Sequence, residues 1–125
     1  MSHFTTIETQ IKDIEALKAA CAEMGLAVMQ NGQARGYDGK THNGEYVIKL
    51  KGPFDIALNR RANGTFQLVT DWWDEHVEKE VGKNFGRLLQ LYGVHKATAE
   101  ARRKGYSVSR GILKDGAIKL CIGGG

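Results

Sequence analysis

The chain has 125 residues, of which 42% are hydrophobic and 26% are charged, and it carries a formal net charge of +4. This composition is typical of a soluble globular protein with one modest core, so we expect a single domain over residues 1–125. No apolar run approaches the roughly 18 residues of a membrane span, and the start MSHFTTIETQIKD lacks the features of a signal peptide. We therefore expect a cytoplasmic protein that does not associate with membranes.

The positive charge is concentrated in two stretches. Residues 86–125 contain eight basic and two acidic residues, and residues 31–70 contain six basic and three acidic residues. The segments 1–30 and 71–85 are net acidic. A basic protein with this pattern could contact phosphate groups, but such patches are also common on proteins that bind nothing acidic.

The chain begins with a strand followed directly by a helix. Thr-rich alternation predicts the strand at His3–Ile11. Asp13 is a suitable helix N-cap, Gly25 suits the position after the helix end, and the apolar residues between them recur at helical spacing: Ile14, Leu17, Cys21 and Met24. We expect a short strand at Leu26–Met29 to return beside the first strand, and a parallel arrangement would make a right-handed βαβ unit.

The next segment is rich in turn signals. Four glycines lie between Asn31 and Gly44, which predicts either a loop-rich insertion or a weak, bulged hairpin. Beyond it, apolar and polar residues alternate from Tyr46 to Lys51 and predict a strand with one face toward solvent. Gly52 and Pro53 end that strand.

The centre of the sheet is predicted by the segment FDIALNRRANGTFQLVTDWW, which ends at Trp73. Two alternating strands flank an Ala62-Asn63-Gly64 turn, the arrangement of an antiparallel hairpin. Alternate side chains share a face, so we expect the inner face to consist of Phe54, Ile56, Leu58, Phe66 and Leu68.

From Asp74 to Tyr92 the apolar residues recur at the spacing of a helix, which predicts a helix over this segment. We expect Gly93 to end this helix and a second, shorter helix to cover Val94–Lys104. Ile112–Ile122 then predicts a terminal hairpin. The chain is therefore expected to be an α+β fold, with a largely antiparallel twisted sheet and helices packed on one face, in the order β-α-β(3–4)-α-α-β-β.

Four blocks of the chain, taken in order, resemble a known family. They are SHFTTIETQIKDIEALKAA, RGYDGK at Arg35–Lys40, the central FDIALNRRANGTFQLVTDWW, and YGVHKATAEARRKGY at Tyr92–Tyr106. Together they are similar to the hypothetical chloroplast reading frame thirty-five family of plastids and cyanobacteria, which also has bacterial members. That family is a domain of unknown function, so the resemblance implies no activity, cofactor or catalytic residue.

The best candidate binding loop combines a guanidinium, a phenol and a carboxylate at Arg35, Tyr37 and Asp38. Its alternative is a simple turn at Asp38-Gly39. A basic sheet face that includes Lys49 and Arg60 is a second candidate, although charged edge strands also serve to prevent aggregation.

Two further features allow both a binding and a structural interpretation. An exposed member of the Trp72 and Trp73 pair could anchor a partner, whereas buried tryptophans would cap the sheet. Acidic residues at 71–80 could hold a cation, but no known metal-ligand pattern accompanies them, so we expect no metal and no cofactor. We expect Cys21 and Cys121 to be reduced, buried thiols.

These observations favour a non-enzymatic binding or adaptor protein that engages another protein, such as an ATPase or a larger assembly. Nucleic-acid binding through a basic sheet or the C-terminal region is the first alternative. A small-molecule or enzyme site between sheet and helices is the second.

Overall fold

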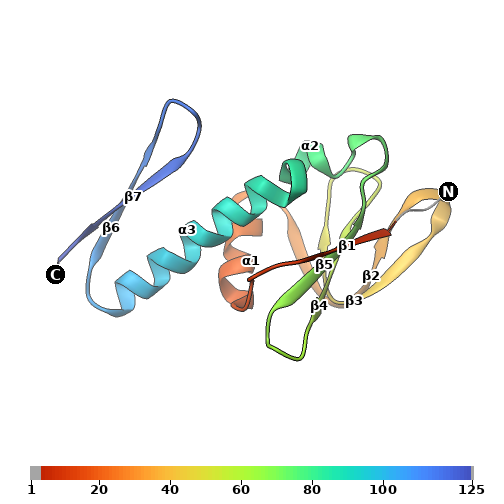
Figure 1. Ribbon diagram of the computed structural model, residues 1–125, viewed down its shortest axis with the longest axis horizontal. Helices are drawn as coiled ribbons and strands as arrows, with labels where there is room; N and C mark the ends of the chain where they lie inside the picture. Colours follow the sequence, from red (N-terminus) through yellow and green to blue (C-terminus); the bar gives the residue numbers. More distant parts are fainter. Residues whose placement is uncertain (1–3, 125) are drawn as a thin grey trace.

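The computed structural model describes residues 4–124 and shows an α+β fold, as the sequence predicts (Figure 1). A five-stranded antiparallel sheet has the strand order β1-β5-β4-β3-β2, and a separate two-stranded sheet pairs β6 with β7. The principal elements are β1 (Phe4–Glu8), α1 (Ile14–Glu23), β2 (Ala27–Arg35), β3 (Thr41–Lys49), β4 (Ile56–Arg60), β5 (Phe66–Asp71), α2 (Glu78–Val81), α3 (Gly86–Arg103), β6 (Ser107–Ile112) and β7 (Ile118–Gly123). Short 3₁₀ turns lie at Tyr37–Gly39, Trp73–Glu75 and Lys83–Phe85.

The first strand is shorter than predicted and has a different neighbour. Its predicted start, His3, lies outside the described residues, and it ends at Glu8, after which the Thr9 hydroxyl donates to the carbonyl oxygen of Phe66 at 2.7 Å. β1 pairs with β5, and β2 pairs with β3 at the opposite edge of the sheet. The prediction that the second strand returns beside the first was therefore wrong, because β5, β4 and β3 lie between β1 and β2 in the sheet.

The predicted first helix is confirmed at both ends. The Asp13 carboxylate accepts hydrogen bonds from the backbone N–H groups of Glu15 and Ala16 at 3.0 and 3.1 Å. Gly25 follows the helix with a φ of 74°. The Tyr92 hydroxyl accepts hydrogen bonds from the backbone N–H groups of Lys12 and Asp13, so α3 also fixes the start of α1.

The main core lies between the helices and one face of the sheet. The five predicted inner-face residues of the central hairpin are all buried there, with at most 5% of any one exposed. Helix residues fill the other side of this core: Leu17, Ala20, Cys21, Val77, Val81, Leu88 and Leu91. Non-directional burial of this apolar surface holds the two layers together.

The glycine-rich segment forms the long β2–β3 hairpin, one of its two predicted alternatives. Asn31 has a φ of 54°, and the side-chain alternation changes there. Val28 packs on the helix-covered face, whereas Ala34 belongs to a small cluster on the other face. The far half of the hairpin thus bends over the sheet.

The sheet face that carries no helix is nevertheless not fully open, because this bend covers part of it. Ala34, Val47, Ala57 and Val69 are at most 2% exposed, and Phe4 packs against them. A Cβ atom on Gly36, at the end of β2, would lie 2.5 Å from the Phe4 ring, so the two edge strands meet at one end. The curled sheet therefore covers the apolar part of its own second face.

The helical break also falls elsewhere than predicted. α3 continues through Gly93, and the interruption lies at residues 82–85, where Gly82, Asn84 and Phe85 have φ values of 86°, 54° and 63°. One glycine inside a helix costs only about 1 kcal/mol. The burial of Phe85, which is 0% exposed, fixes the break where it is.

The end of the chain forms an arm. We define the arm as residues 105–123, which comprise β6, β7 and their turn and project from the end of α3 (Figure 1). Cys121 lies on this arm and is exposed, which corrects its predicted burial, whereas Cys21 is buried as expected. Among residues 4–124, no helix is both long enough and apolar enough to cross a bilayer.

Two glycine variants test the position of the helical break. Gly82→Ala should destabilise the protein by about 1–3 kcal/mol, because its φ of 86° and ψ of 166° suit glycine and its Cβ would lie 2.8 Å from the Arg87 nitrogen. Gly93→Ala should stabilise it by up to about 1 kcal/mol, since Gly93 is helical and its Cβ would meet no atom within 4 Å. Urea unfolding followed by circular dichroism measures both, and the opposite order would contradict this position of the break.

Candidate functional site

The predicted binding loop is anchored by the carboxylate of Asp55, which is 0% exposed. The Arg35 guanidinium donates two hydrogen bonds to this carboxylate, both of 2.8 Å, and the backbone N–H of Arg35 donates a third at 3.0 Å. The backbone N–H of Leu50 adds a fourth at 3.1 Å, and the Lys49 ammonium lies 3.4 Å away. Arg35 also donates to the carbonyl oxygen of Gly52 at 2.9 Å. Arg35 therefore joins β2 to the loop that follows β3.

Burial of Asp55 disfavours its charged form. The hydrogen bonds from Arg35 and from the backbone of Arg35 and Leu50 outweigh that effect, so the pKa of Asp55 is lowered. The side-chain hydrogen bond that Arg35 donates to Asp55 also raises the pKa of Arg35. Both groups are thus charged in the folded protein, and they form a partly buried ion pair.

A second buried carboxylate, that of Asp71, lies beside Asp55. Ile56 of β4 pairs with Thr70 of β5, so Asp55 and Asp71, which are the next residues outward along the two chain segments, lie opposite each other. Asp71 is 0% exposed and accepts hydrogen bonds from the backbone N–H groups of Tyr37 and Trp73 at 3.1 and 3.0 Å. It thereby fixes the tip of the β2–β3 hairpin to the end of β5.

The hydrogen bonds of Asp71 bring Tyr37 and Trp73 together. Their ring centroids are 4.7 Å apart, and Trp73 is 47% exposed. Trp72 instead packs on the buried Phe85 ring at 4.7 Å. One tryptophan of the pair therefore faces the core and the other lies at the surface.

The remaining predicted residues do not join this group. Asp38 is exposed in the turn after β2, with a φ of 58°. Arg60 lies at the β4–β5 turn, where it donates to the carbonyl oxygen of Gly64 and stacks on Phe66 with its guanidinium 4.3 Å from the ring centre. Lys49 is directed to Asp55, so the structure does not bring Lys49 and Arg60 into one basic face.

The acidic segment at 71–80 has structural partners. Glu80 accepts hydrogen bonds from the backbone N–H groups of Lys51 and Gly52 at 2.7 and 3.0 Å, and Asp74 lies 3.7 Å from His76. Within the described part of the chain, no three His, Cys, Asp or Glu side chains are grouped closely enough to hold a metal ion.

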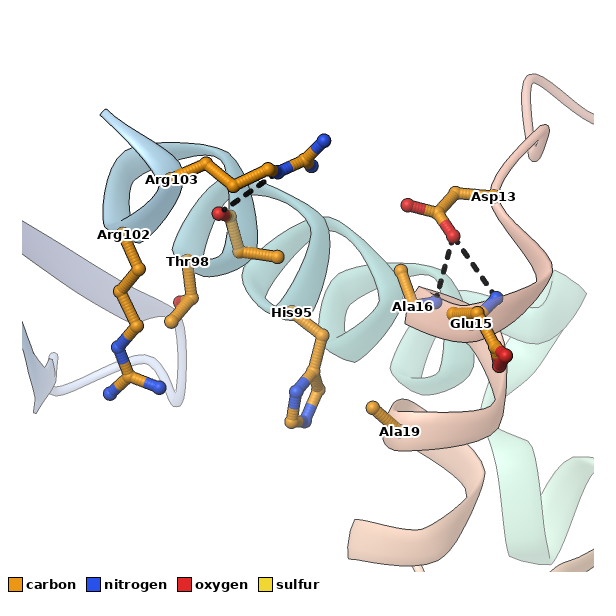
Figure 2. Close-up of a pocket in the computed structure, with 9 residues that line it drawn as sticks. Asp13, Glu15, Ala16, Ala19, His95, Thr98, Arg102 and Arg103 are labelled. Carbon is orange, nitrogen blue, oxygen red and sulfur yellow. Dashed lines mark hydrogen bonds between the residues drawn. The ribbon is translucent and has the colours of Figure 1, made fainter. Parts of the chain in front are cut away.

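A cleft of 440 Å³ opens between α1 and the second half of α3 (Figure 2). Ala16, Ala19 and Ala99 leave it open, and Arg102 and Arg103 lie at its α3 side. Its acidic residues are already engaged. Asp13 caps α1, and Glu15 lies 3.9 Å from Lys18. The charged side chains beside this cleft that have neither an ion pair nor a capping role within the described residues are therefore the cations Arg102 and Arg103.

Glu23, at the end of α1, connects the arm to the rest of the protein. Its carboxylate accepts two hydrogen bonds from the Arg110 guanidinium, at 2.9 and 3.0 Å, and lies 2.7 Å from His95. The Arg110 hydrogen bond is the main cause that lowers the pKa of Glu23. The arm is also held by Ile118, which packs against the main core, and by the backbone N–H of Tyr106, which donates to the carbonyl oxygen of Ala101 at 3.0 Å.

The arm has an apolar face, which was not recognised as a candidate site from the sequence. Strand pairing places five apolar side chains on this side: Val108, Ile112, Ile118, Leu120 and Ile122. Ile112 is 80% exposed and Ile122 is 53% exposed, while Leu113 and Tyr106 beside them are 49% and 41% exposed. The alternation of Ile118, Leu120 and Ile122 was the available signal, but it predicts a strand without showing which part of this face stays exposed.

A groove of 230 Å³ lies between the arm and the end of α3. Ala97, Ala101, Tyr106 and Ile122 line its apolar part, and Glu100 and Lys104 line its polar part. The end of α3 thus adjoins two surface hollows.

Comparison with known proteins defines the class of protein first. The chain matches the family DUF1257, described as a protein of unknown function, over residues 20–121, and it belongs to that family. It is similar to the uncharacterized protein ycf35 of Pyropia yezoensis, with 30% identity over 126 residues, which cover 98% of this chain and 96% of the relative. The corresponding ycf35 proteins of Guillardia theta and Cyanophora paradoxa are 28% and 27% identical, with the same coverage. The resemblance found in the sequence is therefore confirmed.

No solved structure shows a significant match to this chain. Membership of this family therefore does not imply an activity for the chain.

The lowered pKa of Asp55 predicts a specific loss of stability in acid. Unfolded aspartate titrates at about 3.9, so the stabilisation is complete above that value and is lost as the pH falls through the lower folded-state pKa. Asp55→Asn should cost roughly 1.5–3 kcal/mol at neutral pH and should reduce this acid dependence. Urea unfolding at several pH values tests it, with the exposed Asp38→Asn as control. Equal pH profiles for Asp55→Asn and the parent protein would contradict the assignment.

The two cysteines should differ in reactivity. Burial raises the pKa of Cys21 to about 12, and its side chain is 0% exposed, whereas Cys121 is exposed on the arm. A colorimetric thiol reagent should therefore modify one thiol per native chain and both after denaturation. Cys121→Ser should abolish the native reaction. Rapid native modification of both thiols would show that α1 does not protect Cys21.

Proposed function

We propose that this protein is a non-enzymatic binding or adaptor module that contacts a protein partner through its C-terminal arm. The observation that carries this proposal is the distribution of exposed apolar side chains. Residues 4–124 contain six large hydrophobic residues that are exposed, and four of them lie between Tyr106 and Ile122. Clustered exposed apolar residues mark interaction sites more often than single ones do.

The architecture of the arm supports the same proposal. A two-stranded sheet is at best marginally stable alone and is strengthened by a third strand or by a layer that covers its apolar face. The described residues supply only partial cover, from α3 and from the Glu23–Arg110 link. A partner that covers this face would bury Ile112 and Ile122 and would also order the arm.

The other candidate surfaces offer less. Arg35 and Lys49 are already engaged by Asp55, and their release would leave a buried carboxylate without its counter-charge. The space between the sheet and the helices is filled by core side chains, which leaves little room for a small-molecule site there. Trp73 with Tyr37 is a small aromatic surface that could form a secondary contact.

Nucleic-acid binding is a second candidate, favoured by one specific observation. Arg102, Arg103 and Lys104 end α3, and Lys114 and Lys119 lie on the neighbouring arm. Cations grouped in this way could contact successive phosphates.

Affinity capture with matched surface variants tests the first candidate. The full chain and Met29→Asp, a control at an apolar residue that is 50% exposed elsewhere, should recover the same stoichiometric protein from an extract of the source organism. Ile112→Asp/Ile122→Asp should lose it while keeping the circular dichroism spectrum of the parent. Retention of that protein by the arm variant, or recovery of none by the parent, would contradict the proposal.

Salt-dependent binding tests the second candidate. If the cations contact Z phosphates of single-stranded RNA, the logarithm of the affinity should fall with the logarithm of the salt concentration with a slope of about −0.7Z. Fluorescence anisotropy between about 50 and 200 mM salt measures this slope. Absent or salt-independent binding would exclude the nucleic-acid function.

A further inference from the structure

We infer that the arm recognises an extended, acidic protein segment, which pairs with the free edge of β7 and places apolar side chains in the groove beside it. This inference rests on the proposed protein-binding function and adds the chemistry and the geometry of the partner. Three features of the described residues carry it: the open strand edge, the apolar groove beside it, and the charge around both.

The free edge of β7 suits strand addition. In the described part of the chain, β7 pairs with β6 on one side and with no strand on the other. The β7 segment Ile118–Ile122 contains no glycine or proline, and its two isoleucines favour strands. β6 is less suitable, since it contains Gly111 and its Arg110 is held by Glu23. An added strand supplies main-chain hydrogen bonds, and pockets for alternate side chains supply specificity.

The groove between β7 and α3 provides such a pocket. Ile122 and Tyr106 form its arm side, and Ala97 and Ala101 form its α3 side. The small alanine side chains leave room for apolar side chains of an incoming strand, which would reduce the 53% exposure of Ile122. The partner segment should therefore place apolar residues at alternate positions.

The charges around this site specify an acidic partner. Lys104 borders the groove, and Lys114 and Lys119 lie on the arm. Within residues 4–124 none of these three lysines forms an ion pair. Glu100 also lines the groove, but it is paired with Lys96 at 3.2 Å, and Asp115 on the arm accepts a hydrogen bond from the backbone N–H of Ala117. Complementary charge would steer an acidic segment to this surface.

The same charges argue against the other occupants. Two copies of β7 pairing edge to edge would bring the Lys114 and Lys119 side chains of both chains to one surface, and like charges oppose such pairing. RNA would neutralise the cations but would leave the aliphatic Ile112, Leu113 and Ile122 without a suitable contact. An acidic strand with alternate apolar side chains satisfies both the charge and the apolar face.

Two synthetic peptides test this inference on the full chain. In one, valine alternates with glutamate, and in the other lysine replaces every glutamate. The glutamate peptide should bind at least about tenfold more tightly in fluorescence anisotropy, and its affinity should fall as salt increases. Hydrogen exchange should show new protection of the β7 amides in the complex.

Matched variants locate the binding. Lys114→Glu/Lys119→Glu should lose the preference for the glutamate peptide, whereas Lys12→Glu/Lys83→Glu, with the same change in net charge at exposed residues elsewhere, should keep it. Ile122→Asp should weaken both peptides. Circular dichroism confirms that each variant is folded.

Several results would overturn the inference. They are equal affinity for the two peptides, no binding of the glutamate peptide, protection of β6 without β7, or a dimer formed through the arm in analytical ultracentrifugation. If affinity capture depends on Ile112 and Ile122 while the peptides do not discriminate by charge, the proposed function stands and this inference fails. If capture does not depend on the arm, the proposed function itself fails.

Discussion

The buried Asp55 carboxylate joins three parts of the chain that the apolar core alone would not hold together. It receives hydrogen bonds from Arg35 at the end of β2 and from Leu50 after β3, and it directly precedes β4. A buried carboxylate without these donors would carry a desolvation cost of several kcal/mol. The bend of the β2–β3 hairpin over the sheet is therefore coupled to an electrostatic requirement. Asp71 repeats the arrangement one strand away, with the backbone N–H groups of Tyr37 and Trp73 as donors.

This coupling explains why the predicted binding loop at Arg35–Asp38 uses its polar groups for contacts within the protein. Arg35, Tyr37 and Trp73 do come together, but around two internal carboxylates. Sequence patterns predicted these residue types at the surface and could not reveal their partners, since Arg35 and Asp55 are 20 residues apart. Which tryptophan faces outward was equally undetermined, because it depends on the irregular backbone after β5.

Local patterns predicted most of the architecture. The Asp13 cap, the buried face of the central hairpin and the α+β class are confirmed, because each depends on alternation or capping within a few residues, while the order of elements is matched only roughly. The errors involve longer-range constraints. Gly93 remains helical because burial of Phe85 places the break near Gly82, and β1 does not pair with β2 because β5, β4 and β3 lie between them in the sheet. The exposure of the arm depends on how much of it α3 covers, and the periodicity of apolar residues does not predict such contacts between distant elements.

The attachment of the arm has a consequence for how this protein family can diverge. The arm is joined to the core by Ile118 and by the contact of Arg110 with Glu23, while its most exposed side chains touch nothing that stabilises the sheet. Substitutions at such exposed positions typically change folding free energy by less than about 0.5 kcal/mol. The exposed end of the arm can therefore vary in sequence at little cost to the stability of the scaffold.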